Sequence, residues 1–129
     1  MIQTEFPAAV PEIPVERMDA AVDHYRDCLG FSVDWRDTGG GISGVSRGAC
    51  RLFLTDAAFR SAHANAMPAV IWLNLESSDE VDALHAEWVE SGATIVSPPE
   101  DKPWHLHEFT AADVDGNLLR VFYDFSNDL

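Results

Sequence analysis

The chain has 129 residues, of which 47% are hydrophobic, and its 22 acidic and 8 basic side chains give a net charge of −14 at pH 7. A chain of this length can bury roughly two thirds of its unfolded surface, which is enough for one core without stabilising disulfides or metals. The negative field repels phosphate backbones and attracts cations, so it disfavours nucleic-acid binding and favours positively charged ligands, although acidic charge also serves solubility alone.

Targeting signals, apolar runs and cysteines in the sequence predict the cellular compartment of the protein. No basic, apolar leader opens the chain, and no apolar run approaches the ~20 residues that a membrane span needs. The two cysteines, Cys28 and Cys50, lie in apolar-periodic runs, where a buried free thiol is more typical than a disulfide. We therefore expect a cytoplasmic protein that does not bind membranes.

Two helices of similar design are predicted, one in each half of the chain. Each places apolar residues on one face and is followed by a glycine, Gly30 or Gly92, suited to a left-handed C-terminal turn. Ser77 and Glu80 have the spacing of a capping box at the start of the second helix. The apolar faces comprise Met18, Val22, Tyr25 and Leu29 in the first helix, and Val81, Leu84, His85, Trp88 and Val89 in the second.

The repeat of helix, glycine and strand predicts two modules in a single domain, 1–129. The first module is expected over 5–56 and the second over 69–126, with a linker without regular structure over 57–68. The glycine run at 39–41 predicts a flexible hairpin loop, because no Lys-Ser or Lys-Thr follows it to form a phosphate cradle.

The C-terminal part of the chain predicts a β-hairpin. Asp115-Gly116-Asn117 supplies residues that tolerate positive φ, and apolar runs lie on both sides. We expect paired strands over 105–112 and 117–124. The exposed aromatic Trp104, which precedes the first of these strands, points to a binding cleft.

The motifs of this region resemble a known family. The order Pro-Trp at 103–104, Glu-Phe at 108–109 and Asp-x-x-x-Asn at 113–117 with Gly116, followed by an apolar strand, is similar to the C-terminal end of bleomycin resistance proteins. These belong to the vicinal oxygen chelate superfamily, which also contains glyoxalase I and extradiol dioxygenases. Near the other end, 14–31 resembles the family's first strand, helix and Leu-Gly-Phe turn, so the resemblance covers nearly the whole chain.

The resemblance implies an α+β fold in which two βαβββ modules form curved mixed sheets, with ligand held above each cup. It also implies homodimers with grooves at the subunit interface. Val114 stands where the family usually has proline, and His105-Leu106-His107 replaces a shorter glycine-containing stretch. These departures would reshape the groove mouth, and they leave the identity of the ligand open.

Enzymes of the superfamily hold a divalent cation with His and Glu from inner strands, so the equivalent positions predict whether this chain binds metal. Counting along the sequence places them at Val10 or Pro11, near Leu52, near Val70, and at Arg120. None supplies an imidazole or carboxylate, so we expect no metal and no cofactor. His105 and His107, at i and i+2 in a predicted strand, would share a face and offer two imidazoles, but no third ligand is identifiable.

The aromatic residues carry the functional hypothesis. Trp35, Trp72 and Trp104 occupy positions where the resemblance implies groove aromatics, while Trp88 lies on a helix face and is predicted to be core. Trp72 could be a core residue of a central strand, but Asn74 shares its face, and a polar amide there favours a cup lining.

The leading hypothesis is a metal-independent binding protein, not an enzyme, that sequesters an aromatic, positively charged antibiotic of the bleomycin type. The alternative is a metal-dependent glyoxalase-like lyase or extradiol-type dioxygenase, and a metal-free enzyme with Glu108 as general base is a third. The predicted ligand-binding residues are Trp35, Trp72, Asn74, Trp104, His105, His107 and Gly116.

Overall fold

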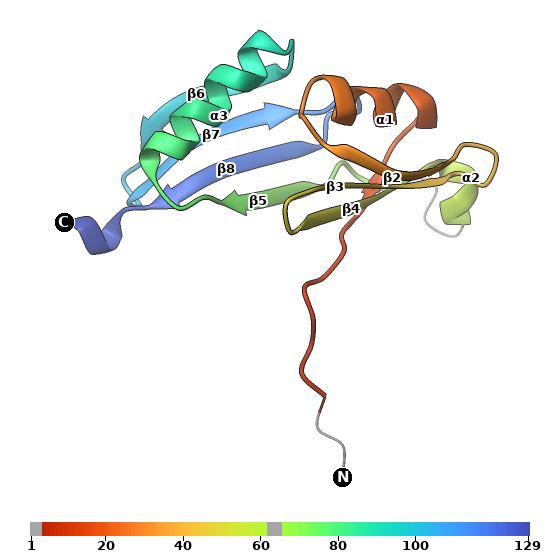
Figure 1. Ribbon diagram of the computed structural model, residues 1–129, viewed down its shortest axis with the longest axis horizontal. Helices are drawn as coiled ribbons and strands as arrows, with labels where there is room; N and C mark the ends of the chain where they lie inside the picture. Colours follow the sequence, from red (N-terminus) through yellow and green to blue (C-terminus); the bar gives the residue numbers. More distant parts are fainter. Residues whose placement is uncertain (1–3, 62–65) are drawn as a thin grey trace.

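The computed structural model describes residues 4–61 and 66–129, and its strands form two four-stranded mixed sheets, one from each half of the chain (Figure 1). The first sheet has the order β1-β4-β3-β2 and the second the order β5-β8-β7-β6. The strands are β1 (Glu12–Pro14), β2 (Ser32–Asp37), β3 (Ile42–Arg47), β4 (Cys50–Thr55), β5 (Val70–Asn74), β6 (Thr94–Asp101), β7 (Leu106–Ala112) and β8 (Leu118–Asp124). In each sheet the first strand pairs in parallel with the last, and the other pairs are antiparallel.

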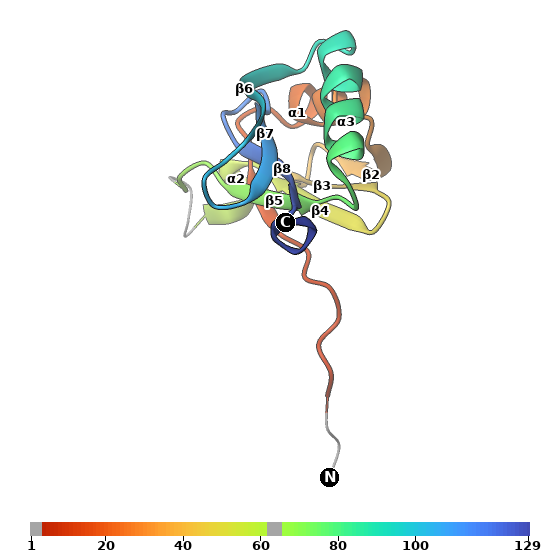
Figure 2. The ribbon, with the colours of Figure 1, turned by 90° about the vertical axis from the view of Figure 1, so that its left-hand side faces the viewer.

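This repeated order confirms the predicted α+β fold of two βαβββ modules. The helices α1 (Met18–Asp27) and α3 (Ser78–Glu90) lie on the same side of the sheets (Figures 1 and 2). Gly30 and Gly92 follow them with φ of 73° and 84°, and Ser77 Oγ accepts a hydrogen bond from the Glu80 amide at 3.1 Å, as their sequence patterns predict. In the part of the chain that the structure describes, neither α1 nor α3 covers the opposite face of the sheets.

The predicted linker contains one element that sequence analysis did not anticipate. The one-turn helix α2 (Ala57–Arg60) forms there because the Asp56 carboxylate accepts a hydrogen bond from the Phe59 amide at 2.9 Å and caps its N-terminus. Residues 62–65 of the predicted linker lie outside the described residues. A 3₁₀ turn, η2 (Ser126–Asp128), ends the chain, and the segment before β1 extends away from the body of the molecule (Figure 1). Across 4–61 and 66–129, the helices are too short or too polar to cross a membrane.

The core lies between the helices and the sheets and joins the two modules. Trp88 of α3 is 1% exposed, as predicted, and its Nε1 donates a hydrogen bond to the carbonyl of Leu29 at 3.1 Å, just beyond α1. Arg47 donates to the same carbonyl at 2.8 Å and pairs with Glu87 of α3 at 2.7 Å. Both cysteines are free and half-buried. Apolar packing and these polar contacts therefore fix the second module against the end of α1.

A buried polar network makes a second connection between the modules. The Asp113 carboxylate accepts hydrogen bonds from the Tyr25 hydroxyl at 2.9 Å and from the Asn117 side-chain amide at 2.8 Å. Asn117 also donates to the carbonyl of Pro14 and accepts from the amide of Ala69. Burial, followed by the nearby Asp113 charge, raises the pKa of Tyr25 well above its usual value. Through Asn117, the β7–β8 turn thus links the end of β1 to the residue just before β5.

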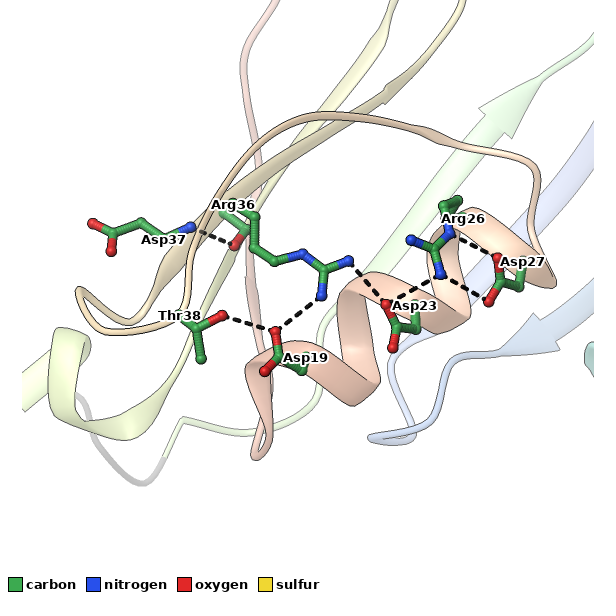
Figure 3. A network of polar contacts seen from close by, with 8 residues as sticks. Asp19, Asp23, Arg26, Asp27, Arg36, Asp37 and Thr38 are labelled. Atoms are coloured by element: carbon green, nitrogen blue, oxygen red, sulfur yellow. Dashed lines mark hydrogen bonds and ion pairs between the residues drawn. The ribbon is translucent and has the colours of Figure 1, made fainter.

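Ion pairs and hydrogen bonds at the surface connect the β2–β3 hairpin to α1 (Figure 3). Arg36 of β2 donates to Asp19 at 2.9 Å and to Asp23 at 2.8 Å, and Thr38 donates to Asp19 at 2.8 Å. Arg26 pairs with Asp23 from within the helix at 3.3 Å. The hydrogen bonds from Thr38 and Arg36 lower the pKa of Asp19. These groups lie on the helix side of the first sheet, away from its open face.

Candidate ligand-binding cup

The open face of the second sheet carries most of the candidate site. Successive residues of a strand point to opposite faces, so the side chains that do not pack under α3 line the uncovered face. In β5, Trp72 and Asn74 are exposed whereas Ile71 and Leu73 are half-buried, which places Trp72 and Asn74 on one face as predicted. We call this surface the cup face; its members are Val70, Trp72, Asn74, Glu108, Thr110, Arg120 and Phe122.

Trp104 leans over one end of this face from the loop between β6 and β7. Its side chain is 60% exposed, and its Nε1 donates a hydrogen bond to Glu108 Oε1 at 2.8 Å. Trp72, on β5, is 50% exposed. Two large indole rings therefore remain available to a ligand on the same sheet, which is unusual for side chains that normally bury most of their surface.

Glu108 is the buried charge of the cup. It is 2% exposed, and only its Oε1 atom is used by Trp104. Its Oε2 atom lies 3.9 Å from Arg120 Nη1, too far for a hydrogen bond, and it accepts none from any residue in the described ranges. Among the described residues, Oε2 is not one of the fully buried polar atoms that lack a partner, so it keeps some contact with solvent although the Glu108 side chain as a whole is nearly buried.

Arg120 lies beside this carboxylate and against Trp72. Its guanidinium carbon is 5.3 Å from the centre of the Trp72 ring, within the range of a cation–π contact, and Nη1 donates to Thr110 Oγ1 at 3.3 Å. Phe122 meets the edge of Trp72, with ring centres 5.6 Å apart. Arg120 therefore reduces the cost of burying the Glu108 charge and at the same time orients the Trp72 ring.

Trp35 belongs to the first sheet and not to this cluster. It is 38% exposed and packs at a tilt on Phe53, with ring centres 5.5 Å apart. It also lies close over Gly44 of β3, where a Cβ atom would come within 2.7 Å of its Nε1. Among the described residues, no ring contact joins Trp35 to Trp72 or Trp104. The open face of the first sheet thus has its own, smaller aromatic surface.

The predicted pairing of His105 and His107 on one strand face is wrong. β7 begins at Leu106, and His105 precedes it with a φ of 66°, so the strand alternation does not extend to it. The His105 ring packs near Phe125, at 5.7 Å between centres. The ring of His107 points to the helix side of the sheet, where it contacts Asp82 of α3. The two imidazoles therefore have different surroundings and do not converge on one ion, and His107 does not lie on the cup face.

Gly116 is in the β7–β8 turn, at the opposite end of β7 from the Trp104 loop. Its φ of 83° is one that residues with a Cβ rarely adopt, and its amide donates to the carbonyl of Asp113 at 3.2 Å. The turn that it closes supports the buried network around Asn117. The structure therefore places Gly116 apart from the indole rings of the second sheet.

The residues at the superfamily's metal positions do not fit a metal. The Val15 amide donates to Thr55, and the Leu75 amide donates to Phe122, so these two links mark equivalent positions in the two modules. Counting from them, the position predicted near Leu52 is Phe53, the equivalent of Arg120, whereas Leu52 itself is a core residue 1% exposed. The four positions hold Val10, Phe53, Val70 and Arg120.

Three apolar side chains and a cation provide no ligand for a dication, and Arg120 would repel one. Within the described residues, no other group of three or more His, Cys, Asp or Glu side chains is arranged to hold a metal ion. We therefore derive no metal chemistry for the cup.

Glu108 is the member of the cup that sequence reasoning undervalued. The sequence suggested it only as a general base, in a chain rich in carboxylates. A usable signal is the alternation of Glu108, Phe109 and Thr110 in β7: Phe109 is core, so its two neighbours must face the cup. Nothing in the sequence signals that Trp104 bonds to this carboxylate.

With the geometry established, comparison with known proteins identifies the family. The model of the Glyoxalase/Bleomycin resistance protein/Dioxygenase superfamily matches residues 8–121. The chain belongs to this superfamily. Comparison with curated protein sequences yields no match.

Solved structures share the fold at low sequence identity. A glyoxalase/bleomycin resistance protein/dioxygenase from Nocardioides aligns with a TM-score of 0.76 at 20% identity, over 95% of this chain and 86% of its own. Lactoylglutathione lyase from Agrobacterium tumefaciens gives 0.72 at 21%, over 92% and 96%. TioX from Micromonospora sp. ML1 gives 0.70 at 20%, over 92% and 99%. At this identity, these likenesses establish the vicinal oxygen chelate fold and not the ligand.

Proposed function

We propose that this protein is a metal-independent binding protein that sequesters an aromatic, positively charged small molecule, an antibiotic of the bleomycin type, in its cup. Binding, and not turnover, is its mechanism. The observation that carries this proposal is the Glu108 carboxylate, which is nearly buried on a face with two half-exposed indole rings and has one oxygen without a hydrogen-bond donor.

Each part of the cup has a physical role in this proposal. Flat rings of the ligand stack on Trp72 and Trp104, at about 1 kcal/mol per aromatic contact beyond simple burial. An N–H group of the ligand donates to Glu108 Oε2, and a hydrogen bond to a charged acceptor is about twice as strong as a neutral one. The net charge of −14 raises the local concentration of cations and speeds their association.

The proposal includes a cytoplasmic homodimer. Members of the superfamily often bind small ligands and form dimers. In this chain the open faces of both sheets carry exposed apolar side chains, among them Trp35, Val70 and Trp72. A second subunit placed over such a face would cover these side chains and supply the far wall of the groove. Trp35 of one subunit would then contribute to a groove that the other subunit completes.

The metal-dependent alternative has less support. One similar structure is a lactoylglutathione lyase, which makes a lyase worth considering for a member of this superfamily. In this chain, however, Val10, Phe53, Val70 and Arg120 stand at the ligand positions, and His105 and His107 contact different neighbours. No observation on the described residues favours a lyase or dioxygenase over binding.

The test is a titration of metal-free bleomycin into the protein in the presence of a chelator, followed by tryptophan fluorescence. Wild type should show saturable quenching, and Glu108→Gln should weaken binding at least about tenfold, because it removes a charge-assisted hydrogen bond. The control is Glu90→Gln, which neutralises an exposed carboxylate at the end of α3 and should leave the affinity unchanged. Equal affinities of the two variants, or no saturable binding by wild type, would overturn the proposal.

A further inference from the structure

His107 makes two contacts that join three elements. Its Nδ1 lies 2.8 Å from Asp101 Oδ1 at the end of β6, and its Nε2 lies 2.7 Å from Asp82 Oδ1 on α3. The His107 side chain is 14% exposed, whereas both carboxylates are largely open to solvent. The ring is therefore held between the helix and the strand hairpin, on the side of the sheet opposite the cup.

The two contacts favour the charged form of the His107 ring. A neutral imidazole has one N–H group and can donate to one carboxylate only, whereas the imidazolium can donate to both. Burial alone lowers the pKa of His107, but hydrogen bonds to Asp82 and Asp101 and the attraction of their charges outweigh it, so that the pKa is raised above its usual value of 6.5. Both contacts exist together only while the ring is charged.

This clamp lies at the base of the loop that carries Trp104. Asp101 and His107 form the last pair between β6 and β7. Within the loop, the Lys102 amide donates to the carbonyl of Leu106 and the His105 amide to that of Lys102, each at 2.9 Å. The residue after His107 is Glu108, which receives the Trp104 indole on the opposite face of the strand. The clamp and the aromatic contact thus share one short stretch of chain.

We propose that His107 is a positioning residue: as the imidazolium bridging Asp82 and Asp101, it holds the β6–β7 loop in the geometry in which Trp104 meets Glu108. Its effect on ligand affinity rests on the function proposed for the cup, but its effect on Trp104 does not. Deprotonation loses one of the two clamp contacts, so the Trp104–Glu108 contact loosens as pH rises through the His107 titration.

Other titratable groups near His107 have partners of their own. On α3, the ring of His85 packs on Phe109 with centres 5.2 Å apart. On β8, Tyr123 is paired with His107 across the sheet, and its hydroxyl donates to Asp128 at 2.7 Å, which raises the pKa of Tyr123 further above neutrality. Asp82 and Asp101 are therefore the carboxylates that set the titration of the clamp.

The experiment is an NMR titration of the ligand-free protein from about pH 5 to pH 9, the range in which histidines titrate. The His107 ring protons and the Trp104 indole N–H resonance should move with the same midpoint. The Trp88 indole N–H, which is buried and bonded to the Leu29 carbonyl, is the internal control and should not follow that midpoint. A Trp104 resonance that stays constant across the His107 titration would overturn the proposal.

Three variants test whether His107 is the group that controls Trp104. Asp82→Asn should lower the midpoint of both His107 and Trp104, because it removes one of the charges that stabilise the imidazolium, whereas Asp79→Asn on the same helix should not. His107→Gln should abolish the pH dependence of Trp104. If the Trp104 midpoint stays in place in Asp82→Asn, or the dependence survives in His107→Gln, another group controls the loop.

Bleomycin affinity measured across the same pH range then separates this inference from the proposed function. In wild type the affinity should fall about two- to fivefold above the His107 midpoint, the size expected for one partly exposed ion pair. In His107→Gln the affinity should show no such fall. Because the drug itself titrates in the same way with both proteins, comparing the two pH profiles separates its titration from that of His107. Matched NMR midpoints without bleomycin binding at any pH would overturn the function and uphold the clamp.

Discussion

Trp104 Nε1 donates to Glu108 Oε1 at 2.8 Å, so an indole that is 60% exposed is anchored by a carboxylate that is 2% exposed. The pair gives the cup an aromatic surface that is fixed in position but still accessible. It also keeps a negative charge under that surface, next to the Arg120 guanidinium. In the proposed function, a ligand ring stacks on this indole and a ligand N–H group donates to this carboxylate.

The aromatic side chains should dominate binding. Trp104→Ala and Trp72→Ala should each weaken bleomycin binding at least about fivefold, because each removes a stacking surface worth on the order of 1 kcal/mol beyond burial. Fluorescence or calorimetric titration would measure this, and circular dichroism should show the fold unchanged. The matched control is Phe59→Ala, which removes an exposed aromatic from α2 and should not alter the affinity. Unchanged affinity in both tryptophan variants would remove them from the site.

The buried network between the modules should matter for stability and not for the ligand. Tyr25→Phe removes the hydrogen bond to the buried Asp113 carboxylate and should lower the free energy of unfolding by about 1.5 to 3 kcal/mol. Urea denaturation would measure the loss. Tyr123→Phe, whose hydroxyl bonds to Asp128 at the surface, is the control and should have little effect. Equal stabilities of the two variants would mean that the network does not join the modules.

The charge on His107 should also appear in the pH dependence of stability. Because its pKa is raised in the folded state, its contribution is fully present below its ordinary value of 6.5 and is lost as pH rises through the folded value. The contribution should be below about 1 kcal/mol, since its partners are solvent-exposed. Urea unfolding of wild type and His107→Gln at a series of pH values would reveal it as a difference that shrinks with rising pH. A difference that grows with rising pH would mean that folding lowers the pKa of His107 and does not raise it.

Cys50 should react slowly in the folded protein. Burial raises the pKa of its thiol, which reduces the thiolate that attacks alkylating reagents. We expect iodoacetamide to modify Cys50 at least several-fold more slowly in native protein than in urea, as followed by peptide mass spectrometry near pH 8. The unfolded chain provides the control for intrinsic reactivity. Equal rates in both states would show that the thiol is not shielded.

Much of the fold could be predicted from the sequence because the patterns that indicate it are local. Apolar spacing and terminal glycines placed both helices, and alternation placed Trp72 and Asn74 on one face. The one-turn helix α2 was missed, because a single capping carboxylate over four residues gives little periodic signal.

The site was harder to predict from the sequence because its contacts are long-range or depend on the register of the strands. Extending β7 by one residue to His105 was enough to place two imidazoles on a shared face that does not exist. The contact of His107 with Asp82, from a helix 25 positions earlier, has no pattern in the sequence. The same holds for Glu108, whose importance comes from burial that only the folded chain reveals.

The most direct test of the central claim, that the cup acts through protein side chains alone, is the metal content per chain. Protein purified without chelator or metal-affinity steps should be analysed for elements as isolated and after incubation with Zn, Ni, Mn and Fe followed by desalting. The side chains of Val10, Phe53, Val70 and Arg120 predict far less than one ion per chain under every condition. Retention of one ion per chain would contradict the account and redirect the search to lyase and dioxygenase substrates.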